Sequence, residues 1–178
     1  IEITGSSDFL VSYLSGSSGI SEVPIGKSIN INDNEWHHYA FTFENSGSSL
    51  VTRLYRDGVL NQQITSGSAV SKVATNTSAC IGSLLFTPGT SAPSDFSLLG
   101  HGQLSASIDE FRFWQAPRNA REIGRFWYQH THGGTSKRES FDHSNSDLTI
   151  YYKFNQPHSG IYSADRVAID YSGRIANG

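Results

Sequence analysis

The stretch SASIDEFRFWQAPRNAREI, residues 105–123, decides the fold. Residues 105–114 alternate with the period of two that an extended strand requires. Large apolar side chains fall on both faces of this strand, which predicts an inner strand of a β-sandwich, covered on each side. One face carries Asp109, Phe111 and Phe113, and the other carries Ile108, Glu110, Arg112 and Trp114.

The second half of the same stretch predicts a short helix. Pro117 has no backbone N–H to donate to a ladder, so the strand ends before it. Asn119 and Glu122 have the spacing of a helix capping box. Ile123 and Phe126 then form an apolar patch that would cover one open end of the sandwich.

Two further motifs predict strands. Residues 35–43, EWHHYAFTF, alternate between His37, Tyr39, Phe41 and Phe43 on one face and Trp36, His38, Ala40 and Thr42 on the other. Residues 50–56 and 59–64 flank Asp57-Gly58, the pair that a two-residue type I′ hairpin favours. Residues 148–155 alternate as well, so an all-β fold with one short helix is predicted.

Composition excludes several classes of function. Only 16% of the 178 residues are charged and the net charge is −3, which argues against a nucleic-acid partner. No apolar run approaches the roughly 18 residues that cross a bilayer, so membrane insertion is not expected. Cys80 is the single cysteine and cannot form an internal disulfide. Because methionine is absent and a strand is already under way at Ile1, we expect a piece of a longer polypeptide.

Three motifs together resemble a known family. EWHHYA at 35–40, LYRDG at 54–58 and IDEFRFW at 108–114 stand in the order and spacing of laminin-G-like domains, within the concanavalin A-like lectin/glucanase group that includes pentraxin-like modules. The resemblance implies a jelly roll of two antiparallel sheets, one of them curved, with the WHH and IDE strands inside it.

The resemblance also implies how the chain is divided. Residues 1–128 would be one laminin-G-like domain that lacks its N-terminal strand, and residues 129–147 a linker. Residues 148–178, with YYKF at 151–154 and DYSGR at 170–174, resemble either a closing strand or the start of a second such domain. Tandem domains of this kind resemble those in structural proteins of tailed phages and in bacterial surface proteins. That predicts an extracellular or virion-surface location, with neighbouring domains or subunits as partners.

Catalysis is not expected, although glucanases share this fold. Retaining enzymes need two carboxyl groups about 5 Å apart. Asp109 and Glu110 are adjacent on a strand and would point to opposite faces, and Ser107 and Phe111 stand where partner acids are needed.

Calcium is the one cofactor that the resemblance implies, held by aspartate, backbone carbonyls and water. Asp109 and Asp170 are the candidate ligands. The alternative is that Asp109 accepts backbone N–H groups while Glu110 pairs with an arginine. The adjacent His37 and His38 would point apart and are expected to be structural, and the His130-His132 pair lies in the expected linker.

Glycan binding is the family's recurrent activity and needs an exposed aromatic ring with polar partners. The candidates are the aromatic residues Phe86, Phe96, Trp127 and Tyr128, and the polar residues Asn76, Asp95 and Gln103. Each of them also fits core or rim packing. The sequence thus predicts a non-catalytic structural or adhesion module of a phage tail, baseplate, fibre or other surface protein, with a calcium-dependent lectin for cell-surface glycan as the alternative.

Overall fold

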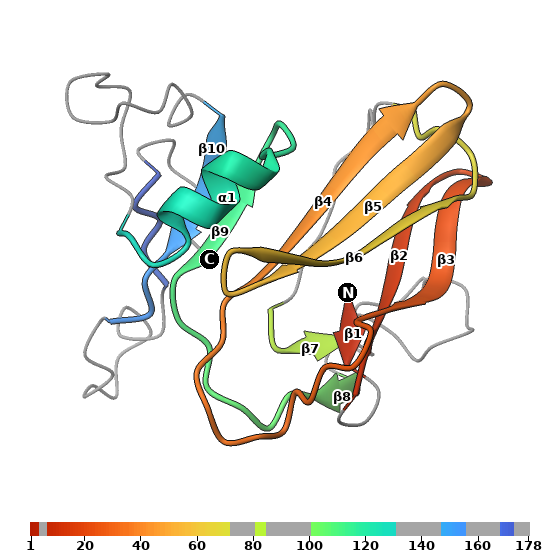
Figure 1. Cartoon of the computed structure of the whole chain (residues 1–178). Coiled ribbons are helices and arrows are strands. Elements are labelled where there is room, and N and C mark those ends of the chain that lie inside the picture. The colour runs from red at the N-terminus through yellow and green to blue at the C-terminus, as the bar shows by residue number, and fades with distance from the viewer. Residues whose placement is uncertain (4–6, 72–80, 85–100, 131–146, 156–167, 173–178) are drawn as a thin grey trace. The chain divides into compact units, whose positions relative to one another are not determined.

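The computed structural model describes residues 1–3, 7–71, 81–84, 101–130, 147–155 and 168–172 (Figure 1). The chain forms two compact units. Residues 1–72 and 109–178 make the larger unit, and residues 73–108 make the smaller one. The strands and the helix are β1 (Glu2–Ile3), β2 (Phe9–Ser15), β3 (Ser18–Ile25), β4 (Tyr39–Ser46), β5 (Ser49–Arg56), β6 (Val59–Ser66), β7 (Ser83–Leu84), β8 (His101–Gln103), β9 (Phe111–Trp114), α1 (Ala120–Phe126) and β10 (Leu148–Tyr152).

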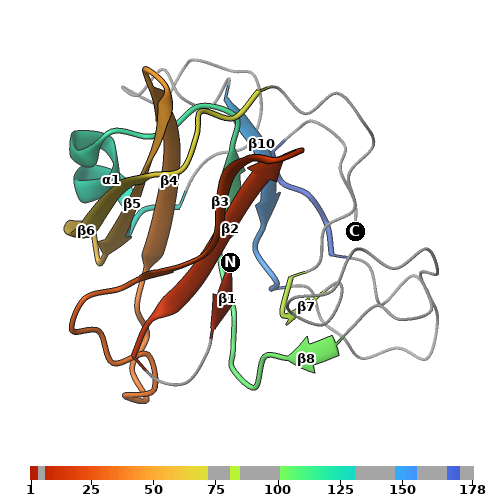
Figure 2. The same cartoon turned by 90° about the vertical axis from the view of Figure 1, so that its right-hand side faces the viewer.

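Two antiparallel three-stranded sheets, β1-β2-β3 and β4-β5-β6, build the core of the larger unit (Figures 1 and 2). Apolar residues from both sheets meet in one buried cluster, so the two sheets pack face to face. The β-sandwich that the sequence predicts is confirmed. The buried cluster between the sheets comprises Phe9, Val11, Ile20, Ile25, Ile29, Leu50 and Leu54.

The aromatic face of β4 lies toward this cluster. Tyr39, Phe41 and Phe43 all pack against the buried cluster. The ring of Phe9 meets those of Tyr39 and Phe41 edge-on, with centroids 5.0 and 5.1 Å away. Such edge-to-face pairs are worth about 0.5–1.5 kcal/mol beyond the area that they bury, so β4 is fixed to the opposite sheet by its aromatic face.

The hairpin between β5 and β6 turns at Asp57-Gly58, as predicted. Asp57 has a φ of 51° and Gly58 a φ of 80°, the positive values that a type I′ turn needs at both central positions. Arg56 and Val59 pair across the turn. This turn matters for the site because it carries Asp57 and Arg56 toward the residues that precede β4.

Both aromatic-rich strands are shorter than the alternation predicts. Strand β9 begins only at Phe111, because Glu110 has a φ of 55° and leaves the extended conformation. Phe113 on this strand is 53% exposed and is therefore not an inward residue. Strand β4 begins at Tyr39, and the preceding Trp36 is 70% exposed. Within the described residues β4 pairs with β5 and β9 with β10, so the two motifs lie in different sheets.

Helix α1 begins with the predicted capping box. The Asn119 side chain accepts the Glu122 backbone N–H, and the Glu122 carboxylate accepts the Asn119 N–H, at 3.0 and 2.9 Å. The C-terminal end of the helix lies beside the β5–β6 turn (Figures 1 and 2). Trp127, just after the helix, packs directly against Gly58, so helix and hairpin position each other.

The smaller unit contains the antiparallel pair β7-β8. Leu104 N–H donates to the Gly82 carbonyl at 2.8 Å and extends this short ladder. Cys80, the single cysteine, lies outside the described residues. Among the helices that the structure describes, none has the length and apolarity to cross a membrane.

Candidate functional site

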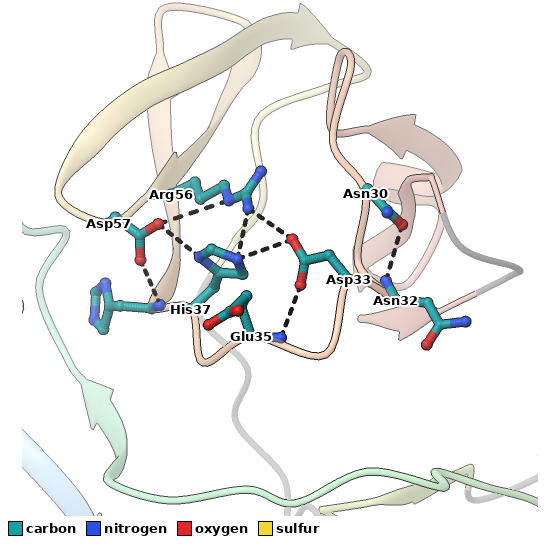
Figure 3. Close-up of polar contacts among 8 residues, drawn as sticks. Asn30, Asn32, Asp33, Glu35, His37, Arg56 and Asp57 are labelled. Atoms are coloured by element: carbon teal, nitrogen blue, oxygen red, sulfur yellow. Dashed lines mark hydrogen bonds and ion pairs between the residues drawn. The ribbon is translucent and has the colours of Figure 1, made fainter.

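Four ionisable side chains meet where the segment before β4 approaches the β5–β6 turn (Figure 3). We call Asp33, His37, Arg56 and Asp57 the histidine cluster. His37 Nδ1 lies 2.8 Å from Asp57 Oδ2, and His37 Nε2 lies 3.0 Å from Asp33 Oδ2. Arg56 Nη2 donates to the same Asp33 oxygen at 3.0 Å. An imidazole thus stands between two carboxylates that come from different segments.

The carboxylates of the histidine cluster also fix the backbone. Asp57 Oδ1 accepts the His38 N–H at 2.9 Å, and the Asp57 N–H donates to the His38 carbonyl, also at 2.9 Å. Asp33 Oδ1 accepts the Glu35 N–H at 3.1 Å, in the pattern of an Asx turn (Figure 3). These bonds hold residues 33–38 in an irregular conformation, which is why β4 does not extend back to Trp36.

The cluster perturbs the acidities of its members. The hydrogen bond to Asp57 raises the pKa of His37, and the bond to Asp33 adds to it against the opposing effect of burial. Burial works to raise the pKa of Asp33, but the Glu35 N–H, the His37 ring and the Arg56 charge outweigh it, so that this pKa is lowered. The arrangement therefore favours a charged imidazole between charged carboxylates.

His38 faces a different environment from His37, as expected for adjacent residues. Its ring lies 6.1 Å from that of Trp127, and its Nδ1 is buried without a hydrogen-bond partner. Burial lowers the pKa of His38, and the positive charge of Arg112 lowers it further. The two neighbouring histidines are thus shifted in opposite directions.

The environment of His38 leads to a prediction about acid. A histidine with a depressed pKa contributes stability that is full above its unfolded value of 6.5 and is lost as the pH falls below it. We expect the His38→Gln variant, whose side chain does not titrate, to lose less unfolding free energy than the wild type between pH 7 and 5. Urea titrations at each pH measure the difference, and equal losses would contradict the assignment.

A second polar cluster lies between β9 and β10, and we call it the glutamate cluster. Glu110 Oε2 accepts hydrogen bonds from the Tyr151 hydroxyl and from Arg112 Nη2, the latter at 2.7 Å. Glu110 Oε1 lies 3.1 Å from His130 Nδ1. Arg112 Nη2 also donates to the Gln129 carbonyl at 2.7 Å, and its guanidinium lies over the Tyr151 ring. One carboxylate thus joins both strands to the segment after α1.

The donors around Glu110 determine its ionisation. Burial works to raise the pKa of Glu110, but the hydrogen bonds from Tyr151 and Arg112 prevail and lower it. Burial and the same bond raise the pKa of Tyr151 to about 12. Glu110 is therefore a fixed anion, whereas a general acid near neutral pH needs a raised pKa.

The two predicted calcium ligands both accept hydrogen bonds. Asp109 is exposed, and its Oδ1 accepts the Glu110 N–H at 2.9 Å. Asp170 Oδ1 accepts the Tyr151 and Ser172 N–H groups at 2.8 and 2.9 Å. These contacts, with the Glu110–Arg112 pair, match the alternative interpretation of Asp109 and Glu110. Within the described ranges no three histidine, cysteine or acidic side chains group as a metal site requires, and calcium binding remains a prediction.

The predicted aromatic ligands separate into two groups. Trp127 is half-buried against Gly58, whereas Tyr128 is 66% exposed, and the two rings meet edge-on at 5.6 Å. The backbone of Gln103 lies in β8. The remaining predicted residues, Asn76, Phe86, Asp95 and Phe96, together with His132, lie outside the described residues.

Sequence reasoning missed two features of the site. Trp36 is more exposed than Tyr128. This exposure was not predicted, because strand alternation placed Trp36 in a covered sheet. Asp33 joins the histidine cluster, although it was not among the predicted site residues. Asp33 and His37 are four residues apart, and this spacing can bring the two side chains together only where the backbone is not an extended strand.

Comparison with known proteins identifies a family. The family model described as the concanavalin A-like lectin/glucanases superfamily, of laminin G type, matches residues 1–124. No curated protein and no solved structure matches the chain.

Proposed function

Because the chain belongs to the concanavalin A-like lectin/glucanase superfamily, we propose that it is a non-catalytic structural or adhesion module of a larger extracellular or virion protein. The observation that carries the proposal is that the charged side chains of both clusters are already paired with one another. Glu110 has Tyr151, Arg112 and His130 as partners, and Asp33 and Asp57 enclose His37. These are the contacts of structural ion pairs rather than of groups poised for proton transfer.

Exposed apolar side chains near the β5–β6 turn support a role in binding. Val59 is 70% and Leu60 46% exposed immediately after the β5–β6 turn. Gly58 in this turn packs on Trp127, whose ring contacts the exposed Tyr128. We call Val59, Leu60 and Tyr128 the hairpin surface. Exposed apolar side chains near one turn are candidates for a protein interface, and in the proposal they contact a neighbouring domain or subunit.

Tyr128 also favours the alternative function, a lectin. An exposed ring that is held edge-on by a second, half-buried ring is a rigid platform on which a sugar can stack. In this version of the proposal calcium would be a second requirement, and Asp109 and Asp170 would be its ligands.

A glycan array with and without a chelator distinguishes the two functions. For the structural module we expect no glycan signal, and cross-linking within the assembled parent protein should place contacts at Val59 or Tyr128. For the lectin we expect binding that Tyr128→Ala abolishes and that Phe113→Ala, which removes an exposed aromatic ring from strand β9, leaves unchanged. Hydrolysis of β-glucans by the purified protein would overturn both versions.

A further inference from the structure

His37 Nε2 faces two groups that make opposite demands on it (Figure 3). Arg56 Nη2 lies 2.6 Å away and can only donate a hydrogen bond. Asp33 Oδ2 lies 3.0 Å away and, when ionised, can only accept one. A ring nitrogen carries either a lone pair or a proton, so the two contacts cannot both be hydrogen bonds at the same time.

The other ring nitrogen has no such choice. His37 Nδ1 lies 2.8 Å from Asp57 Oδ2, and this carboxylate also accepts the His38 N–H through its second oxygen. An ionised carboxylate needs a donor, so Nδ1 carries a proton in every state. A single proton on Nε2 therefore decides which partner His37 holds. Without it Arg56 donates to Nε2, and with it Nε2 donates to Asp33.

We propose that His37 is a proton-controlled clamp: when its Nε2 is protonated the ring joins Asp33 to Asp57 of the β5–β6 turn, and when it is not Asp33 keeps only its bond from Arg56 to that hairpin. The protonated ring bridges Asp33 and Asp57 and cancels the excess negative charge of the cluster. The neutral ring leaves two carboxylates with the single charge of Arg56. Tyr39, whose ring centroid lies 6.1 Å from that of His37, is a further titratable group near the ring.

The direction of the effect follows from linkage. The pKa of His37 is raised above 6.5 in the folded chain, first by the bond to Asp57. The stabilisation by the protonated ring is therefore complete below pH 6.5 and is lost as the pH rises through the folded pKa. The segment that the clamp holds carries Trp36, which is 70% exposed. The clamp thus makes the presentation of an exposed aromatic side chain dependent on pH in the range above 6.5.

Nuclear magnetic resonance of the wild-type chain tests the clamp directly. We expect the His37 ring to keep a proton on Nδ1 throughout, to lose the Nε2 proton in a single step, and to have a pKa above 6.5. Above that step Asp33 has lost its charge-assisted hydrogen bond from His37. The Glu35 N–H, which donates to Asp33, should then exchange with solvent about tenfold faster. A His37 pKa of 6.5 or below, or the Nε2–H tautomer at high pH, would overturn the proposal.

Two variants separate the clamp from a merely structural histidine. Asp33→Asn removes the acceptor charge and should lower the pKa of His37 while the Nδ1 bond to Asp57 persists. In this variant the Glu35 N–H should exchange at the same rate below and above the pKa of His37. His130→Gln is the matched control, because His130 pairs with Glu110 in the other cluster and should leave the titration of His37 unchanged. An unaltered pKa of His37 in Asp33→Asn would contradict the clamp.

Discussion

The Gly58→Ala variant loses about 2–4 kcal/mol of unfolding free energy, whereas Gly47→Ala loses about 1 kcal/mol. Both glycines lie in hairpin turns with positive φ, 80° for Gly58 and 61° for Gly47. The free-energy cost of placing an L-residue in this conformation is therefore similar at both positions. The surroundings differ, since a Cβ at Gly58 would lie 2.2 Å from Trp127 Cδ1, and a Cβ at Gly47 would meet nothing within 4 Å.

Urea unfolding followed by circular dichroism measures the two losses. Repeating Gly58→Ala in a Trp127→Ala background completes a double-mutant cycle. With the indole removed, the alanine at 58 should cost no more than the alanine at 47. Equal losses in the wild-type background would mean that α1 does not rest on the β5–β6 turn.

Local chemistry explains why parts of the fold could be predicted. The Asp57-Gly58 turn needs positive φ at two positions, and few residue pairs other than this one favour it. The capping box at Asn119 and Glu122 closes within four residues. Neither feature depends on distant contacts, and both are confirmed.

The missed features depend on contacts between distant residues. Alternation from Ser105 to Trp114 states which faces the side chains would occupy if the backbone stayed extended. Glu110 instead adopts a φ of 55°, and its carboxylate reaches Tyr151, which lies 41 residues further along the chain. Strain of this kind persists only where surrounding contacts fix it. The pattern of residues 105–114 does not indicate a contact with Tyr151, so it could not predict this conformation.

The candidate site was predictable in part for the same reason. The pairing of Glu110 with an arginine and the turn at Asp109 were among the alternatives, because neighbours in sequence supply both partners. The histidine cluster instead combines two motifs that the family resemblance identifies separately. Only the fold brings Asp57 within hydrogen-bond distance of His37, whereas Asp33 precedes His37 by four residues.

The Glu110→Ala variant is expected to lose about 3 kcal/mol of unfolding free energy, because removing one partner of a largely buried ion pair leaves the other uncompensated. The Arg112 side chain is 12% exposed and that of Glu110 is 25% exposed. Arg112 Nε already has no hydrogen-bond partner, so the loss of Glu110 leaves the guanidinium with the Gln129 carbonyl. The hydroxyl of Tyr151 loses its acceptor in the same step.

Glu44→Ala is the matched control, since Glu44 forms an equally short ion pair with Arg53 at 2.8 Å but is 49% exposed. Surface pairs of this kind contribute about 1 kcal/mol or less.

The loss of stability in acid supplies a second measurement. The folded pKa of Glu110 lies below 4.5, so the stability that it contributes is present above pH 4.5 and is lost as the pH falls through the folded value. Glu110→Ala should lack that part of the acid-induced loss. If the two alanine variants lost equal free energy, the glutamate cluster would be a surface feature, and the argument that its carboxylate joins β9, β10 and the segment after α1 would fail.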